Sequence, residues 1–379
     1  KKNDKAIEKY MAFFGHTYPT EKLSYKHCRV FKTTFGRKTL YYTYNNGLII
    51  FSMNEQMMYA SLNHLLLADN QTSTSFGQLI KTADRNTAFH LYIQNDVLEN
   101  HIKTNKPVFL DPISWNYLSV CRQSALDLSF KNGKIILSGY MILDSTTNRH
   151  PFYSKRSTFP DYYTLLPRHT TAVFALFGND FNKLTSLYTT KVGSYEDFLS
   201  MMKPNSIITF TLQNNTAANF ILMRSDEVEE AKFHLFNCVN NTYEKNMYQM
   251  DTSYYEGLMI GGIDIPNFFL SRLELCPEIK RLKAFTVMDN YILFSDSDTN
   301  IRQYISLIKN NEFITADSNF IQSDFYFQQE TNMLYYKEID HTNKGSSAGD
   351  FFANIKSYRW QLTYYKNNKL FFTLMLDPK

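Results

Sequence analysis

The 379-residue chain lacks several features that mark common protein classes. No apolar run approaches the roughly eighteen residues that a membrane-spanning helix needs, and the longest runs, such as Leu370–Leu376, suit buried strands. Dense runs of Lys and Arg are also missing, and 40 basic against 36 acidic residues give a formal charge of only +4. Because binding to a phosphate backbone needs clustered cations, the composition argues against a nucleic-acid-binding protein.

Cysteine is scarce as well. The 4 cysteines are far apart and none forms a Cys-x-x-Cys pair, which argues against a zinc site and a thioredoxin-type redox site. An even number permits two disulfides, and free buried thiols are the alternative. The sequence therefore leaves the redox compartment open for Cys28, Cys121, Cys238 and Cys276.

Tryptophan is nearly absent, with 2 residues, whereas the chain contains 27 Tyr and 31 Phe. Aromatic runs favour β-strands, so the composition predicts a sheet-rich fold. Hydrophobic residues make up 44% of the chain, enough for a core. We interpret most aromatic side chains as core and sheet packing; alternatively, they line a ligand groove or a partner interface.

One pattern of residues occurs twice. Thr43–Ser52 and Thr286–Ser295 each contain the end of one apolar run, a polar turn, and a second apolar run that ends in Phe-Ser. Such a turn between two strand-like runs predicts a β-hairpin. The two copies are separated by an offset of 243 residues (294 − 51).

A helix is predicted after each hairpin, and a longer hairpin closes each copy. The helices are indicated by apolar residues at i, i+4 and i+7. These are Met58, Leu62 and Leu65 in the first copy, and Ile301, Ile305 and Ile308 in the second. The closing hairpins, Ser124–Asp144 and Arg359–Asp377, turn at Asn and Gly residues that tolerate the positive φ of a type I′ turn. The sequence therefore predicts a duplicated unit of roughly one hundred residues.

The second copy is preceded by a lead-in, residues 160–243, that has no counterpart ahead of the first copy. It contains the strand-like runs Ala172–Leu176, Ile207–Leu212 and Phe220–Met223, and two predicted helices between residues 181 and 202. We expect the missing counterpart of 84 residues (243 − 160 + 1) to lie upstream in a precursor or to be supplied by a partner.

The predicted domains follow from this repeat. We expect residues 1–150 to form a first unit that lacks its N-terminal portion, and residues 151–379 to form a second, complete unit. The chain opens with Lys1-Lys2 and shows no signal peptide, which we interpret as a processed or trimmed form. The predicted fold class is α+β: two tandem related units of mainly antiparallel sheet with helices packed on one face.

A resemblance to a known family adds a cellular context. The duplicated unit, the opening Leu166-Pro167-x-x-Thr170 and the Asn-, Tyr- and Lys-rich composition resemble an uncharacterised envelope-protein family of Gram-negative bacteria, a domain of unknown function. The resemblance implies a periplasmic or cell-envelope-associated repeat region that follows an upstream membrane anchor or export signal. It implies no activity and no functional residues.

One string looks like a catalytic motif. Gly345–Gly349 fits the Gly-x-Ser-x-Gly nucleophile elbow, a chemistry that needs a histidine later in the chain. The last histidine is His341, which precedes Ser347. We therefore interpret this string as a flexible loop of small residues.

A second string begins like a calcium-binding loop. In Asp296–Asn300 and the residues after it, the sixth position is Ile301 instead of Gly, and the twelfth is Leu307 instead of Glu. We expect Asp and Ser in this string to cap the helix that follows.

Other polar residues give no site either. The 9 histidines show no metal-binding spacing, and we expect His90 in a strand and His64 on a helix to be packed or surface residues. The acidic cluster Asp226–Glu230 is interpreted as a solvated helix start, with cation binding as the alternative. Gly261-Gly262 belongs to no phosphate-binding pattern.

No catalytic, cofactor-binding or metal-binding residue is predicted. The leading hypothesis is a non-catalytic extracytoplasmic envelope protein that binds a protein or another envelope partner. The alternatives are a carrier or sensor of an apolar, lipid-like ligand and an enzyme whose residues converge only in space. A closed apolar cavity would favour the carrier, clustered carboxylates in a cleft the enzyme, and an unpaired strand edge or exposed aromatic patch the partner-binding protein.

Overall fold

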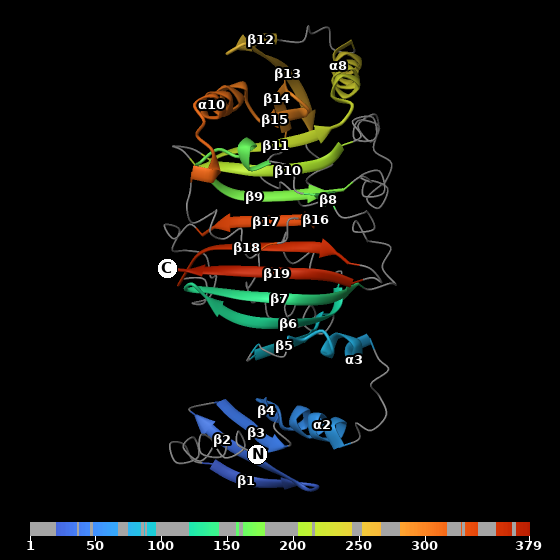
Figure 1. The fold of residues 1–379 in the computed structure, drawn as a ribbon, viewed down its shortest axis with the longest axis vertical. Helices are drawn as coiled ribbons and strands as arrows, with labels where there is room; N and C mark the ends of the chain where they lie inside the picture. Colours follow the sequence, from blue (N-terminus) through green and yellow to red (C-terminus); the bar gives the residue numbers. More distant parts are fainter. Residues whose placement is uncertain are drawn as a thin grey trace. The chain divides into compact units, whose positions relative to one another are not determined.

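The computed structural model divides the chain into two compact units, Lys1–Gln78 and Leu79–Lys379 (Figure 1). Each unit is described by itself below. The structure describes residues 20–35, 38–45, 48–66, 75–84, 87, 89–95, 121–143, 157–158, 162–178, 204–213, 217–244, 252–266, 281–316, 327, 330–339, 354–365 and 369–379.

The first unit contains a four-stranded antiparallel meander with the order β1-β2-β3-β4. Its strands are β1 (Thr20–Tyr25), β2 (Cys28–Phe35), β3 (Lys38–Asn45) and β4 (Leu48–Ser52). The helix α2 (Glu55–Leu66) follows, and its apolar stripe packs on the meander. Met58 and Leu62 from this stripe are fully buried against Val30 and Tyr41. The short helix α3 (Ser75–Ile80) lies at the division between the units.

The second unit is built on one thirteen-stranded sheet in which every pairing is antiparallel. From one end to the other, its strands are β12 (Thr252–Tyr255), β13 (Leu258–Pro266), β14 (Arg281–Met288), β15 (Tyr291–Ser295), β11 (Ala217–Ser225), β10 (Pro204–Gln213), β9 (Thr170–Phe177), β17 (Met333–Glu338), β18 (Ile355–Tyr364), β19 (Lys369–Pro378), β7 (Lys134–Leu143), β6 (Cys121–Lys131) and β5 (Phe89–Gln94). A separate two-stranded ribbon pairs β8 (Ser157–Thr158) with β16 (Glu330–Thr331).

Two helices cover opposite faces of the large sheet near β11 and β15. Ile221 and Met223 of β11 share a core with Leu235 of α8 (Val228–Glu244). Phe220 and Leu222, which alternate with them along the strand, share the other core with α10 (Asp298–Lys309). Since successive strand residues point to opposite faces, α8 and α10 lie on different sides of the sheet.

Two single-turn helices complete the second core. They are η1 (Tyr162–Leu165) and η3 (Ile314–Ala316). Tyr162 and Ile314 are buried there, and the Tyr304 hydroxyl of α10 donates to the Leu165 carbonyl at 2.8 Å. Burial raises the pKa of Tyr304, so its hydroxyl stays a hydrogen-bond donor over the physiological range.

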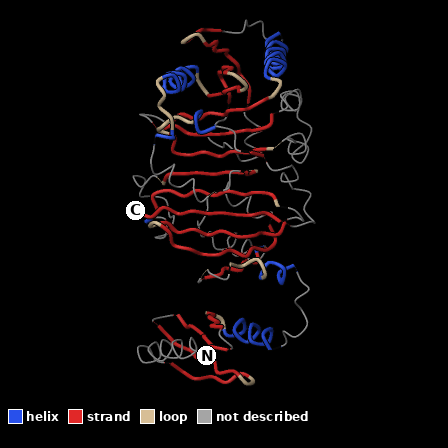
Figure 2. Tube along the Cα trace, viewed as in Figure 1, coloured by secondary structure: helices blue, strands red, loops and turns tan. Residues whose placement is uncertain are grey.

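The predicted α+β class with helices on one face is wrong. Most described residues lie in antiparallel strands, and the helices are few (Figure 2). Strands such as β10 and β11 are buried at successive positions, so both faces of the sheet need cover and helices pack on both. The closing hairpins of the two predicted units, β6–β7 and β18–β19, also share this one sheet through the β7–β19 pairing.

Many local predictions agree with the structure. The lead-in strands correspond to β9, β10 and β11, whereas the two helices predicted between residues 181 and 202 lie outside the described residues. The predicted type I′ turn between β6 and β7 has positive φ at both Asn132 (51°) and Gly133 (75°). The division at residue 150, which rests on the repeat, stays a prediction.

The meander β12–β15 with α10 is similar to the meander β1–β4 with α2. Both have four strands in sequential order, and both are followed by a helix of 12 residues. In each meander, the hydroxyl of a buried threonine on the third strand donates a hydrogen bond to a backbone carbonyl of the second strand. The Thr43 hydroxyl donates to the Arg29 carbonyl at 2.6 Å, and the Thr286 hydroxyl donates to the Met259 carbonyl at 2.8 Å.

The helices of the two meanders are held by matching contacts too. The Asn63 amide of α2 donates to the Tyr25 hydroxyl of β1 at 2.7 Å. Ser306 occupies the same position of α10, and its hydroxyl hydrogen-bonds the Tyr255 hydroxyl of β12 at 2.8 Å. The two regions thus share side-chain contacts as well as strand order.

Candidate functional site: the exposed sheet edges

The four terminal strands of the two sheets, β1, β4, β5 and β12, are of two kinds. β1 is polar, and Glu21 on it pairs with Lys32 at 3.2 Å. β12 has only 4 residues. Charged and very short edges resist pairing with other chains. β4 and β5 have neither protection.

β5 is the most exposed strand of the large sheet. It pairs with β6, and no described strand pairs with its other side. Phe89, Leu91 and Tyr92 on it are exposed large hydrophobic side chains. They lie on both faces of the strand, which is unusual because apolar side chains normally leave water on at least one face.

A histidine–aspartate pair anchors β5 to β6. His90 Nδ1 lies 2.6 Å from Asp127 Oδ1, and Asp127 Oδ2 accepts the Asp84 N–H at 2.9 Å. Burial, and then the charge of Asp127, raise the pKa of the neighbouring Tyr92. Within the described residues no hydroxyl or thiol hydrogen-bonds His90. The pair therefore holds the edge strand against β6.

β4 presents a second apolar edge in the other sheet. Ile49 and Phe51 on the strand, and Met53 and Met57 just after it, are exposed. The opposite side of the meander is the one that α2 covers, through Met58 and Leu62. The sequence analysis named no residue on β4 or β5 as functional; its expectation that a partner could supply a counterpart of the lead-in is the one signal that bears on these edges.

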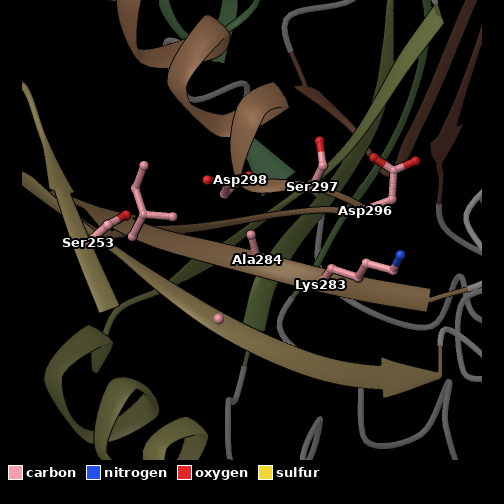
Figure 3. A pocket seen from close by; sticks show the side chains of 8 residues that line it. Ser253, Lys283, Ala284, Asp296, Ser297 and Asp298 are labelled. Carbon is pink, nitrogen blue, oxygen red and sulfur yellow. The ribbon is translucent and has the colours of Figure 1, made fainter. Parts of the chain in front are cut away.

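An open pocket of about 310 Å³ lies at the start of α10 (Figure 3). Most of its polar side chains already have partners. Ser297 caps α10 by accepting the Asn300 N–H, and Asp296 accepts the Asn300 amide at 2.7 Å. Asp298 lies 3.5 Å from Arg302, which donates to Ser253 at 2.8 Å. The prediction that Asp296–Asn300 caps the helix is therefore confirmed.

The remaining candidates from the sequence are scattered. Asp226–Glu230 begins α8, as predicted, and Asp226 accepts the Asn205 amide at 2.8 Å. Gly261-Gly262 lies inside β13. His64 is on α2 as predicted, but its side chain lies outside the described residues. All of Gly345–Gly349 also lies outside the described residues. Among the described residues no three His, Cys, Asp or Glu side chains gather as a metal site would require.

Two of the four cysteines can be placed. Cys28 and Cys121 are buried and belong to no disulfide, whereas the side chains of Cys238 and Cys276 lie outside the described residues. Burial raises the pKa of the Cys121 thiol far above its usual range, so this thiol stays protonated and unreactive in the folded chain.

Comparisons with known proteins identify no relative. No protein-family model, curated protein or solved structure matches the chain significantly. Among the described helices, none has the length and apolar character to span a bilayer.

Proposed function

We propose that this protein is a non-catalytic binding protein that takes up a polypeptide strand at the β5 edge of its large sheet. The main support for this proposal is that β5, a terminal strand, exposes Phe89 and Leu91 to solvent. An extended segment that adds to such an edge gains main-chain hydrogen bonds and buries these side chains.

Two further proposals belong to this function. The first is that the two similar regions are copies of one unit; the matching threonine and tyrosine hydrogen bonds of the two meanders support it. The second is a place in the periplasm or cell envelope, with a membrane anchor upstream. It is supported by the resemblance of the repeat to envelope proteins alone.

The lipid-carrier alternative has less support. A carrier needs a closed apolar cavity of several hundred Å³. The pocket at α10 has about that volume, but it is open and charged side chains line it. The described residues therefore favour the edge over the pocket as the binding surface.

The proposal is tested with a labelled generic strand peptide of alternating Val and Thr with lysines at both ends. We expect the peptide to bind the full chain and to slow amide hydrogen exchange in Phe89–Gln94. Leu91→Lys should weaken binding at least tenfold, because a charge then occupies the apolar edge.

Phe130→Lys is the matched control. Phe130 is also exposed, at 65%, but it lies on β6 beyond the residues that pair with β5. This variant should bind the peptide like the unmodified chain. Equal loss in both variants, or unchanged exchange in β5, would refute strand binding at this edge.

A further inference from the structure

The two closing hairpins allow β5 to be matched residue by residue with a buried strand. Lys131 closes the β6–β7 turn by pairing with Lys134. Tyr365 closes the β18–β19 turn, where its N–H donates to the Lys369 carbonyl at 2.7 Å. Counting back from these two residues, the middle strands β6 and β18 correspond position by position.

The outer strands then correspond as well. Leu128 lies three residues before Lys131 and faces Phe89 of β5, while Leu362 lies three residues before Tyr365 and faces Met333 of β17. The match places Phe89 with Met333 and Leu91 with Tyr335. Phe89 is 60% exposed and Met333 1%; Leu91 is 43% exposed and Tyr335 4%.

The same contrast separates β4 from β15. Ile50 faces Thr43, and Leu293 faces Thr286, the two threonines with matching hydrogen bonds. Phe51 therefore corresponds to Phe294. The Phe51 side chain is 57% exposed, whereas Phe294 is completely buried.

The strands that bury β15 and β17 come from one contiguous meander, β9-β10-β11. β9 pairs with β17, and Phe174 lies opposite Tyr335 with their ring centroids 6.1 Å apart. β11 pairs with β15, and Ile221 lies opposite Phe294. Both β9 and β11 are apolar on two faces, so each fits an edge that is apolar on two faces.

We propose that β5 binds a β9-like strand and, independently of it, β4 binds a β11-like strand, each supplied by polypeptide outside these 379 residues. This inference rests on the proposed function and names the occupant. The occupant of each edge is an antiparallel strand with the apolar pattern of β9 or β11. The β9-like strand buries Phe89 and Leu91 of β5, and the β11-like strand buries Ile49 and Phe51 of β4.

The probes are three synthetic peptides with the sequences of β9, β10 and β11, each carrying the same terminal lysines. With the full chain, the β9 peptide should slow amide exchange in β5 more than in β4, and the β11 peptide should do the reverse. The β10 peptide is the control, because β10 pairs with neither β15 nor β17. Leu91→Lys should reduce binding of the β9 peptide at least tenfold and leave the β11 peptide unaffected.

Disulfide trapping tests the register. The chain carries Leu91→Cys with Cys238→Ser and Cys276→Ser, and the β9 peptide carries either Phe174→Cys or Val173→Cys. The first peptide should trap and the second should not, because neighbouring positions of a strand point to opposite faces. Equal trapping by both peptides would overturn the assigned register and the β9-like occupant.

The other outcomes are equally decisive. If the generic peptide binds β5 as well as the β9 peptide does, and the β11 peptide shows no preference for β4, this inference fails while strand binding stands. If no peptide slows exchange in β5, both fail. If sedimentation shows a dimer of the chain that Leu91→Lys dissociates, a second copy occupies the edge and the inference is overturned.

Discussion

β5 and β17 occupy matching places in two similar three-stranded meanders, yet only β17 is buried. Their sequences, FHLYIQ and MLYYKE, are similarly apolar. β17 lies between β18 and β9, whereas β5 has β6 on one side and no described strand on the other. The difference therefore comes from the neighbours of the strand and not from its own residues.

The residues of a terminal strand indicate whether another strand covers its edge. Natural edge strands are usually shortened or charged so that they do not recruit other chains. β12 and β1 follow that pattern, since one has 4 residues and the other carries Glu21 and Lys22. β5 and β4 retain the apolar sequence of interior strands. An edge with an interior sequence is best explained by a partner strand that covers it.

A lysine at the matched positions Tyr335 and Leu91 tests most directly whether β17 is buried and β5 is exposed. Tyr335 stacks on Trp360 with ring centroids 5.6 Å apart, so Tyr335→Lys buries an unpaired charge. We expect a loss of about 3–5 kcal/mol in the free energy of unfolding. Leu91→Lys places the charge in water and should change stability by less than about 0.5 kcal/mol.

Urea denaturation of the full chain, followed by circular dichroism, measures both effects. Leu91→Phe is the control for the loss of the leucine itself and should behave like the unmodified chain. A large destabilisation by Leu91→Lys would mean that β5 is already covered, and the contrast between the two strands would disappear.

A smaller difference is expected at the middle strands, where Trp360 and Leu126 correspond. Trp360 is fully buried against Tyr335 and Phe174, so Trp360→Ala should cost about 3–5 kcal/mol. Leu126 is buried too, but it faces the exposed Leu91. The exposed strand β5 can move into the cavity that Leu126→Ala leaves. We therefore expect this variant to lose about 2 kcal/mol in the free energy of unfolding, near the low end of the range for buried leucines.

The midpoints of urea denaturation measure the effects of Trp360→Ala and Leu126→Ala as well. Trp360→Phe keeps an aromatic ring against Phe174 and should retain most of the stability lost in Trp360→Ala. If Leu126→Ala destabilises the chain as much as Trp360→Ala does, β5 is as rigid as β17 and the comparison has to be revised.

The sequence predicted the local structure of both meanders better than their surroundings. The predicted stripes agree with the described side chains: Met58, Leu62, Ile301 and Ile305 are buried and Ile308 is partly buried, while the Leu65 side chain lies outside the described residues. These predictions succeed because a helix stripe and a polar turn are encoded within a few residues.

The arrangement of the sheets could not be predicted in the same way. The pairing of Leu374 in β19 with Leu137 in β7 joins residues far apart in the chain, and no local pattern encodes it. Strands buried on both faces lose the alternation that would tell which face a helix covers, so α8 and α10 were placed on one face in error. The exposure of Leu91 was hidden too, because its strand reads as an interior one.

The smallest expected effects concern the helix caps, where the two meanders should respond alike. The Asn54 side chain accepts the Met57 N–H at 3.1 Å ahead of α2, and Ser297 accepts the Asn300 N–H at 3.2 Å ahead of α10. Asn54→Ala and Ser297→Ala should each cost about 1 kcal/mol, measured as faster amide exchange in the first turn of the respective helix.

Exchanging the two N-cap residues, Asn54 and Ser297, adds a control to this test. Asn and Ser are almost equally good at the N-cap, so Asn54→Ser and Ser297→Asn should restore slow exchange in both helices. The second cap has one additional contact, because Asp296 accepts the Asn300 amide, whereas the matching residue ahead of α2 is the exposed Met53. Asp296→Met should therefore speed exchange only in α10. Faster exchange in α2 alone after the cap exchange would show that the two helix starts are not equivalent, and the residue-by-residue match between the meanders would fail at its most local point.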